Sequence, residues 1–172
     1  MKTQIVSVLA FSSLLTIPLV TQQGTANRLT GSDETFVTKA AQGNMAEIQL
    51  GQLAEKNASS TAVKDFGKRM VTDHNKLESQ LQKVATDEHA TLPTALNAKD
   101  QATVDQLSKL TGPAFDRAYI NDMVRDHRAD IGEFSRESGH GSDEMVKQFA
   151  MNSLPTLREH LRLAETTQKE VK

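Results

Sequence analysis

Apolar side chains recur every three or four residues through most of the chain, which is the spacing of amphipathic helices. Four such seams are present, separated by turn-forming and helix-capping residues. They predict four long helices, over residues 33–57, 60–88, 114–138 and 142–170. A shorter helix is expected from Lys99 to Leu110, before the break at Thr111-Gly112-Pro113. The pattern therefore indicates an all-α protein.

The links between the long helices differ in length. A few residues join the first helix to the second and the third to the fourth, so each pair is expected to form an antiparallel hairpin. The second and third helices are separated by the 24 residues from 89 to 112. An extended link of this size can span a bundle roughly 40 Å long. We therefore predict a ferritin-like four-helix bundle with a long crossover that makes helices 2 and 3 parallel.

The chain begins with a pattern typical of a secretory signal peptide. One positive charge is followed by the apolar run from Ile5 to Val20, and the small residues Gly24 and Ala26 precede a cleavage point after Ala26. The alternative is an N-terminal membrane anchor, for which the run is short against the usual ~20 apolar residues. The predicted organisation is a signal peptide at 1–26, a short tail at 27–32 and a helical bundle domain at 33–172.

Export would place the mature protein in the periplasm or outside the cell. No other stretch of the sequence could span a bilayer, so we do not expect an integral membrane protein after signal cleavage. Lys plus Arg is 20 and Asp plus Glu is 22, without a basic cluster, so nucleic-acid binding is not expected. Cysteine is absent, which excludes thiolate metal sites and a thiol nucleophile. Protein partners and oligomeric state stay open.

Each of the four seams is interrupted by one side chain that can bind a metal ion. These residues are Glu47, His74, His127 and His160. Measured from the midpoints of the predicted helices, all four fall within roughly 8 Å of one level at 1.5 Å per residue. Inward-facing ligands from several helices are how bundles build metal sites. One carboxylate and three imidazoles suit a single transition metal ion such as Zn, Mn, Fe, Ni or Cu.

The same four residues have a metal-free interpretation. A buried carboxylate needs a partner, and the three imidazoles could supply it as a polar layer of hydrogen bonds and ion pairs. The sequence leaves both interpretations open. His89 and His140 lie in predicted loops and receive no role.

An acidic residue precedes each seam histidine. Met-Val-x-Asp-His occurs at residues 70–74 and again at 123–127, and Glu159 precedes His160. Asp73, Asp126 and Glu159 are therefore candidates to accept a hydrogen bond from an imidazole of a neighbouring helix and to hold its tautomer. Their alternative role is as solvated acids paired with nearby arginines.

Several motifs together resemble a known bacterial family. They are Phe36-Val37 with Ala40-Ala41, Glu47, the two Met-Val-x-Asp-His motifs, Phe115-Asp116-x-x-Tyr119 and Leu154-Pro155-x-Leu157-x-x-His160-Leu161. From Asp33 to Glu170 the chain is similar to the domain-of-unknown-function family 4142, often labelled predicted outer membrane protein. The resemblance implies a ferritin-like bundle and an export signal, and it implies no established activity. Many members carry a lipidation cysteine, which this chain lacks.

Three functions follow as hypotheses. The first is an exported, non-enzymatic and stress-related bundle protein whose core binds one transition metal ion. The second is a metal-dependent enzyme acting on oxidants or metal ions, which an open coordination position would favour. The third is a purely structural or partner-binding bundle. Ferroxidase chemistry is not expected, because no Glu-x-x-His lies on a seam as it does in ferritins.

Overall fold

The computed structural model of the protein describes residues 28, 29 and 31–171. The predicted signal peptide and its cleavage point lie outside the described residues. The described part is helical and contains no strand, which confirms the all-α prediction. Its helices are α1 (Gly31–Asn57), α2 (Thr61–Asp87), α3 (Ala98–Leu107), α4 (Gly112–His140) and α5 (Glu144–Glu170). Among these helices, none combines the length and apolar character needed to cross a bilayer.

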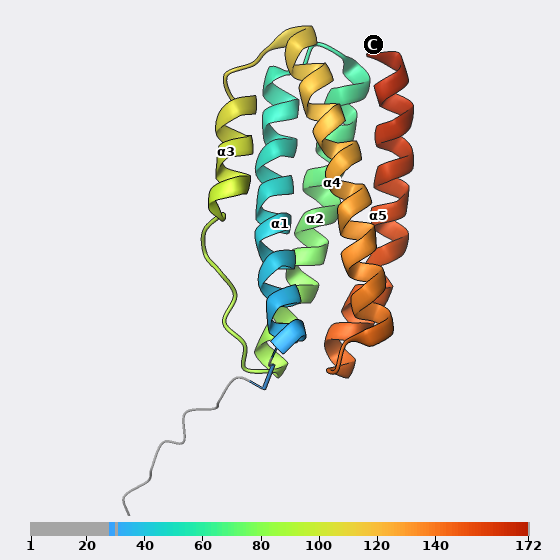
Figure 1. Ribbon diagram of the computed structural model, residues 1–172. Coiled ribbons are helices and arrows are strands. Elements are labelled where there is room, and N and C mark those ends of the chain that lie inside the picture. Colours follow the sequence, from blue (N-terminus) through green and yellow to red (C-terminus); the bar gives the residue numbers. More distant parts are fainter. Residues whose placement is uncertain (1–27, 30, 172) are drawn as a thin grey trace, which may run out of the picture.

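The four long helices pack as two antiparallel hairpins, α1 with α2 and α4 with α5 (Figure 1). Helix α2 also contacts α5, and α1 contacts α4, so each hairpin lies against the other. The link after α2 returns along the length of the bundle and carries α3 on its outer side (Figure 1). Helices α2 and α4 therefore run in the same direction, as the length of this link predicts.

Each hairpin caps the other at one end of the bundle. The Asp33 carboxylate of α1 accepts hydrogen bonds from the backbone amides of Ser142 and Asp143, just before α5. At the opposite end, the Asp116 carboxylate of α4 accepts the amides of Ser59 and Ser60, just before α2. A carboxylate at a helix N-terminus satisfies free N–H groups and favours the helix dipole. The two acids thus join the hairpins at both ends.

Helices α1 and α2 approach closely because two glycines face each other. A Cβ atom on Gly67 would lie 2.7 Å from the Cβ of Ala54 and 2.8 Å from the carbonyl oxygen of Gly51. No side chain fits there without separating the backbones.

The hydrophobic core is divided into two clusters by a polar layer. One cluster contains Phe36, Leu81, Phe134 and Phe149, and the other contains Leu50, Phe66, Phe115 and Ile120. Between them each long helix turns a polar side chain inward. These side chains are Asn44 and Glu47 on α1, His74 on α2, His127 on α4 and His160 on α5, all of them buried. The candidate site is this layer.

Candidate metal centre

Three histidines from three helices meet in the polar layer. His74, His127 and His160 are 2%, 0% and 0% exposed. The ring centroids of His74 and His127 are 5.9 Å apart, and the centroid of the His160 ring lies 5.3 Å from each of them. One ring nitrogen of each lies within 4.8 Å of those of the other two. Among the described residues, these three side chains form a group of potential ligands close enough together to hold one metal ion.

An amide on α1 orients the first of these rings. Nδ1 of His74 lies 2.9 Å from Oδ1 of Asn44. The amide nitrogen of Asn44 in turn donates to the Glu78 carboxylate over 3.4 Å, which places its oxygen toward the ring. His74 Nδ1 therefore carries the proton, and Nε2 carries the lone pair. Within the described part of the chain, this buried Nε2 has no hydrogen-bond partner.

The other two rings are oriented by a backbone carbonyl and a carboxylate. His127 Nδ1 donates to the carbonyl oxygen of Met123 over 3.0 Å. His160 Nε2 donates to Oδ2 of Asp73 over 3.1 Å. Asp73 is itself paired with Arg69 one turn earlier on α2. These bonds place the ring protons on the outer nitrogens and leave lone pairs on His127 Nε2 and His160 Nδ1.

The inner nitrogens therefore face one another as acceptors. His127 Nε2 and His160 Nδ1 are 3.3 Å apart, and neither carries a proton while both outer bonds are made. In a tetrahedral site with metal–nitrogen bonds of about 2.0–2.1 Å, two ligand nitrogens lie about 3.3 Å apart. Outer hydrogen-bond acceptors that fix the tautomer are typical of metal-binding histidines. The arrangement fits a cation better than a hydrogen bond.

Burial also keeps protons off these rings. It lowers the pKa of His127 to about 3, with a further contribution from the nearby His160. Burial likewise lowers the pKa of His74, with contributions from His127 and His160. The pKa of His160 is lowered by burial, although its hydrogen bond to Asp73 opposes this. The rings are therefore neutral at pH 7, the form that binds metals.

Glu47 lies beside the three rings but outside the group of converging atoms. It is 4% exposed, and its Oε1 lies 3.9 Å from the outer nitrogen of His127, Nδ1. Burial raises the pKa of Glu47 well above its ordinary value, and the charges of Asp130 and Asp126 raise it further. Metal ligation by Glu47, which the sequence predicts, would need its carboxylate to move toward the inner nitrogens.

The three acids that precede the histidines do not share one environment. Asp73 makes the cross-helix contact to an imidazole that the sequence predicts. Burial alone would raise its pKa, but hydrogen bonds from Arg69 and His160 lower the pKa of Asp73 to about 2. Oδ1 of Asp126 lies 3.6 Å from Nε of Arg125, and the half-buried Glu159 pairs with Arg162 over 2.8 Å. The last two follow the alternative interpretation, as acids paired with arginines.

Sequence reasoning missed the acceptors that orient the other two rings. Asn44 lies one turn before Glu47 on the same side of α1. The only sign of its role in the sequence is that a polar residue occurs beside the apolar seam. The Met123 carbonyl is a backbone atom four residues before His127, and no residue type marks it.

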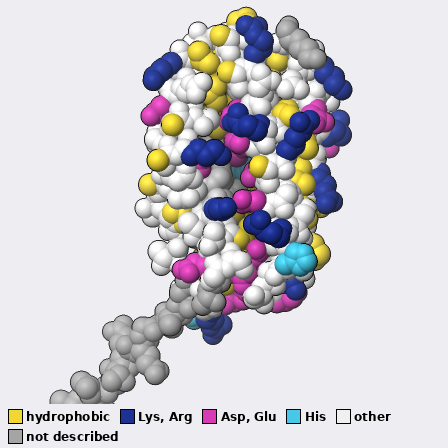
Figure 2. Space-filling view, viewed as in Figure 1, with side chains coloured by type: hydrophobic (Ala, Val, Ile, Leu, Met, Phe, Trp, Pro, Cys, Tyr) yellow, Lys and Arg dark blue, Asp and Glu magenta, His cyan; other side chains and the backbone are white. Residues whose placement is uncertain are grey.

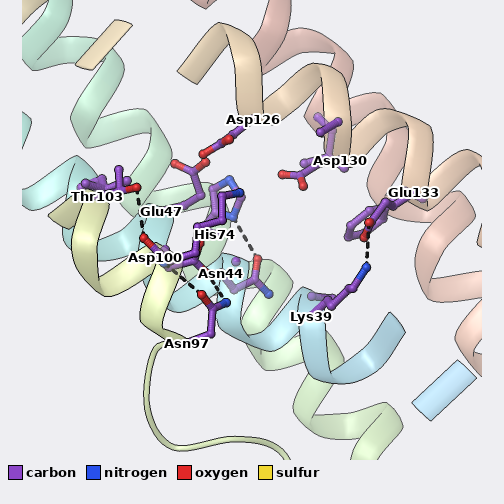
Figure 3. Close-up of a pocket in the computed structure, with 18 of the residues that line it drawn as sticks. Lys39, Asn44, Glu47, His74, Asn97, Asp100, Thr103, Asp126, Asp130 and Glu133 are labelled. Carbon is purple, nitrogen blue, oxygen red and sulfur yellow. Dashed lines mark hydrogen bonds and ion pairs between the residues drawn. The ribbon is translucent and has the colours of Figure 1, made fainter. Parts of the chain in front are cut away.

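A cavity of about 330 Å³ connects this layer with the surface between α1, α3 and α4. In Figure 2, charged side chains of both signs surround a hollow on this face. Glu47 and His74 line its inner part. Figure 3 shows the carboxyl groups of Glu47, Asp126 and Asp130 extending into the same space near the His74 ring. The cavity therefore reaches the edge of the centre, at His74, from one side of the bundle.

A family model described as Domain of unknown function (DUF4142) matches residues 18–167. The chain belongs to this family. The match confirms the resemblance carried by the sequence motifs, and the family description assigns no activity. No curated protein matches this DUF4142 chain.

The DUF4142 chain also resembles a solved structure, the crystal structure of a DUF305 fragment from Deinococcus radiodurans. The TM-score is 0.72 at 15% sequence identity, and the match covers 82% of this chain and 97% of that chain. Such low identity shows the fold alone, so function rests on the site.

Proposed function

We propose that this DUF4142 protein binds one transition metal ion through His74, His127 and His160. The observation that carries the proposal is the convergence of three buried ring nitrogens whose protons are held on the outer side by Asn44, Met123 and Asp73. An all-imidazole set suits Zn, Cu, Fe or Ni better than Mn, which prefers oxygen ligands. The role is that of a binding protein.

Metal titration of the dialysed, untagged protein tests this proposal. Isothermal calorimetry with Zn²⁺ and with Ni²⁺ should give one site per chain. His127→Ala should abolish that site, whereas His140→Ala should retain it, because His140 is exposed at the end of α4. Circular dichroism of each variant establishes that the bundle is still folded.

Absence of binding in the folded wild-type protein would contradict the proposal. The three rings would then form a metal-free polar layer. Elemental analysis of protein purified from its native compartment adds the identity of the ion, and it needs no histidine tag that would compete for metal.

A second candidate function is a metal-dependent enzyme that acts on small oxidants or metal ions. It is favoured by the cavity that reaches His74 and by a centre with three protein ligands, since catalytic metal sites keep one position open. Decomposition of hydrogen peroxide by the metal-loaded protein, compared with His127→Ala, tests it. Equal rates for the two proteins would reject this function.

We also propose that the chain is an exported, ferritin-like protein. Export is supported by the apolar run and by the small residues Gly24 and Ala26. The crossover between two parallel helices supports the ferritin-like assignment. Mass spectrometry of protein from cell fractions should find a mature chain that begins at Asn27 in the periplasm or medium. A chain that retains Met1 in the cytoplasm would contradict export.

A further inference from the structure

The cavity between α1, α3 and α4 has an excess of acidic side chains. Its lining includes the carboxyl groups Glu47, Asp100, Asp126, Asp130 and Glu133, and the lysines Lys39 and Lys99. One of the lysines is already engaged, because Lys39 pairs with Glu133 over 3.0 Å. A cleft lined by one sign of charge concentrates the electrostatic field and raises the local concentration of counter-ions. The excess of carboxyl groups over lysines therefore favours cations over anions in this cavity.

Two groups at its inner part are buried without partners. Within the described part of the chain, neither Oε2 of Glu47 nor Nε2 of His74 has a hydrogen-bond partner. Both residues line the cavity, and both are at least 95% buried. A buried polar group without a partner is costly. A hydrated or partly dehydrated cation in this position would satisfy the carboxylate oxygen and then the ring nitrogen.

Burial and neighbouring acids raise the pKa of one carboxyl group of the cavity, that of Asp130. Burial raises the pKa of Asp130 to about 7, with contributions from the charges of Asp126 and Glu133. Carboxyl groups that oppose one another's ionisation are stabilised when a cation lies among them.

We propose that this cavity is the path by which a divalent metal ion reaches the three-histidine centre, with Asp126 and Asp130 at its outer part and Glu47 as the last carboxylate before His74. The inference rests on the proposed function, since it needs a metal at the histidines. Among the described residues, no three of these carboxylates converge closely enough to hold an ion, as the three histidines do. Their role is therefore transfer of the ion and not storage.

The kinetics of metal uptake separate a path from a ligand. Removing a charge from a path slows association and dissociation together, so the equilibrium affinity is retained. Removing a ligand lowers the affinity itself. Co²⁺ is a suitable probe, because its visible absorption strengthens when it enters a four-coordinate site and can be followed by stopped-flow mixing.

The variants are Glu47→Gln and Asp130→Asn, which keep the shape of each side chain and remove its ability to ionise beside a cation. Asp65→Asn is the matched control, because Asp65 is an exposed acid of α2 that pairs with Lys68 outside the cavity. At low salt we expect the two cavity variants to take up Co²⁺ roughly tenfold more slowly than the wild type. The control should match the wild type, and the difference should shrink at high salt, where charges are screened. Affinity should stay within about threefold in all of them.

Unchanged uptake rates in both cavity variants, with binding intact, would overturn the path and leave the histidine centre standing. Loss of equilibrium affinity in Glu47→Gln would also overturn it, because Glu47 would then be a ligand. A wild-type protein that takes up no Co²⁺ would overturn the histidine centre and the path together.

Discussion

His160 shows most directly how single residues shape the centre. Its ring donates from Nε2 to Asp73, so its Nδ1 faces His127 as an acceptor. Asp73 is in turn fixed by Arg69, which keeps it ionised. A chain of contacts thus runs from the surface of α2 to the metal-facing nitrogen. The tautomer of His160 depends on this carboxylate.

Asp73→Asn should therefore weaken metal binding without unfolding the bundle. The substitution keeps the shape but removes the charge that favours the Nε2 proton, and loss of such an outer partner typically costs about 10–100-fold in affinity. Asp65→Asn, an exposed change on the same helix, serves as the control and should leave affinity unchanged. Calorimetric titration measures both. Equal affinities in the wild type and Asp73→Asn would show that the carboxylate does not set the tautomer.

The pH dependence of binding should reflect the burial of the rings. Protonated imidazole cannot bind a metal, so three rings with ordinary pKa values near 6.5 would lose about a thousandfold in affinity between pH 7.5 and 5.5. The pKa of His127 is about 3, and those of His74 and His160 are also lowered. Proton competition then begins at lower pH, and we expect less than a tenfold loss over this range. Titrations at the two pH values decide between these outcomes.

At the scale of the elements, the hydrophobic pattern was sufficient to predict every long helix. The ends of α1, α2, α4 and α5 lie within two residues of the predicted bounds. The carboxylates that accept the amides just before α2 and α5 could not be predicted, because Asp116 and Asp33 come from the opposite hairpin. The side chain of Asp143 caps α5 locally, whereas the amide of Ser142 just before it is accepted by Asp33 of the other hairpin. Spacing along one helix carries no signal for a contact between residues 109 positions apart.

The close contact between α1 and α2 gives a prediction at this scale. Gly67→Ala should lower the free energy of unfolding by roughly 1–2 kcal/mol, because the new Cβ would force two backbones apart. Gly132→Ala on α4 is the matched control, since a Cβ there meets nothing within 4 Å. It should raise the free energy of unfolding by roughly 0.5–1 kcal/mol through helix propensity. Chemical denaturation would contradict this packing if both variants were stabilised.

For the whole molecule, the polar layer lies where two apolar clusters meet. The seam positions predicted that the three histidines would share a level, because residues on inward faces at equal height must approach one another in a bundle. The seams did not predict that Glu47 would lie at the outer nitrogen of His127 or beside a cavity. That outcome depends on α3 and on the acids of α4, which lie outside any seam. The hydrophobic pattern thus determines the topology, whereas contacts between the hairpins determine the chemistry of the site.

X-ray absorption spectroscopy of the zinc-loaded protein tests the central claim most directly. The account predicts a first coordination shell at about 2.0 Å that contains three imidazole nitrogens, with the outer scattering typical of imidazole rings. The same spectrum from His127→Ala, loaded identically, should lose at least one imidazole or hold no zinc after dialysis. A wild-type shell made of oxygen ligands, or a spectrum unchanged by His127→Ala, would contradict a metal centre built from His74, His127 and His160.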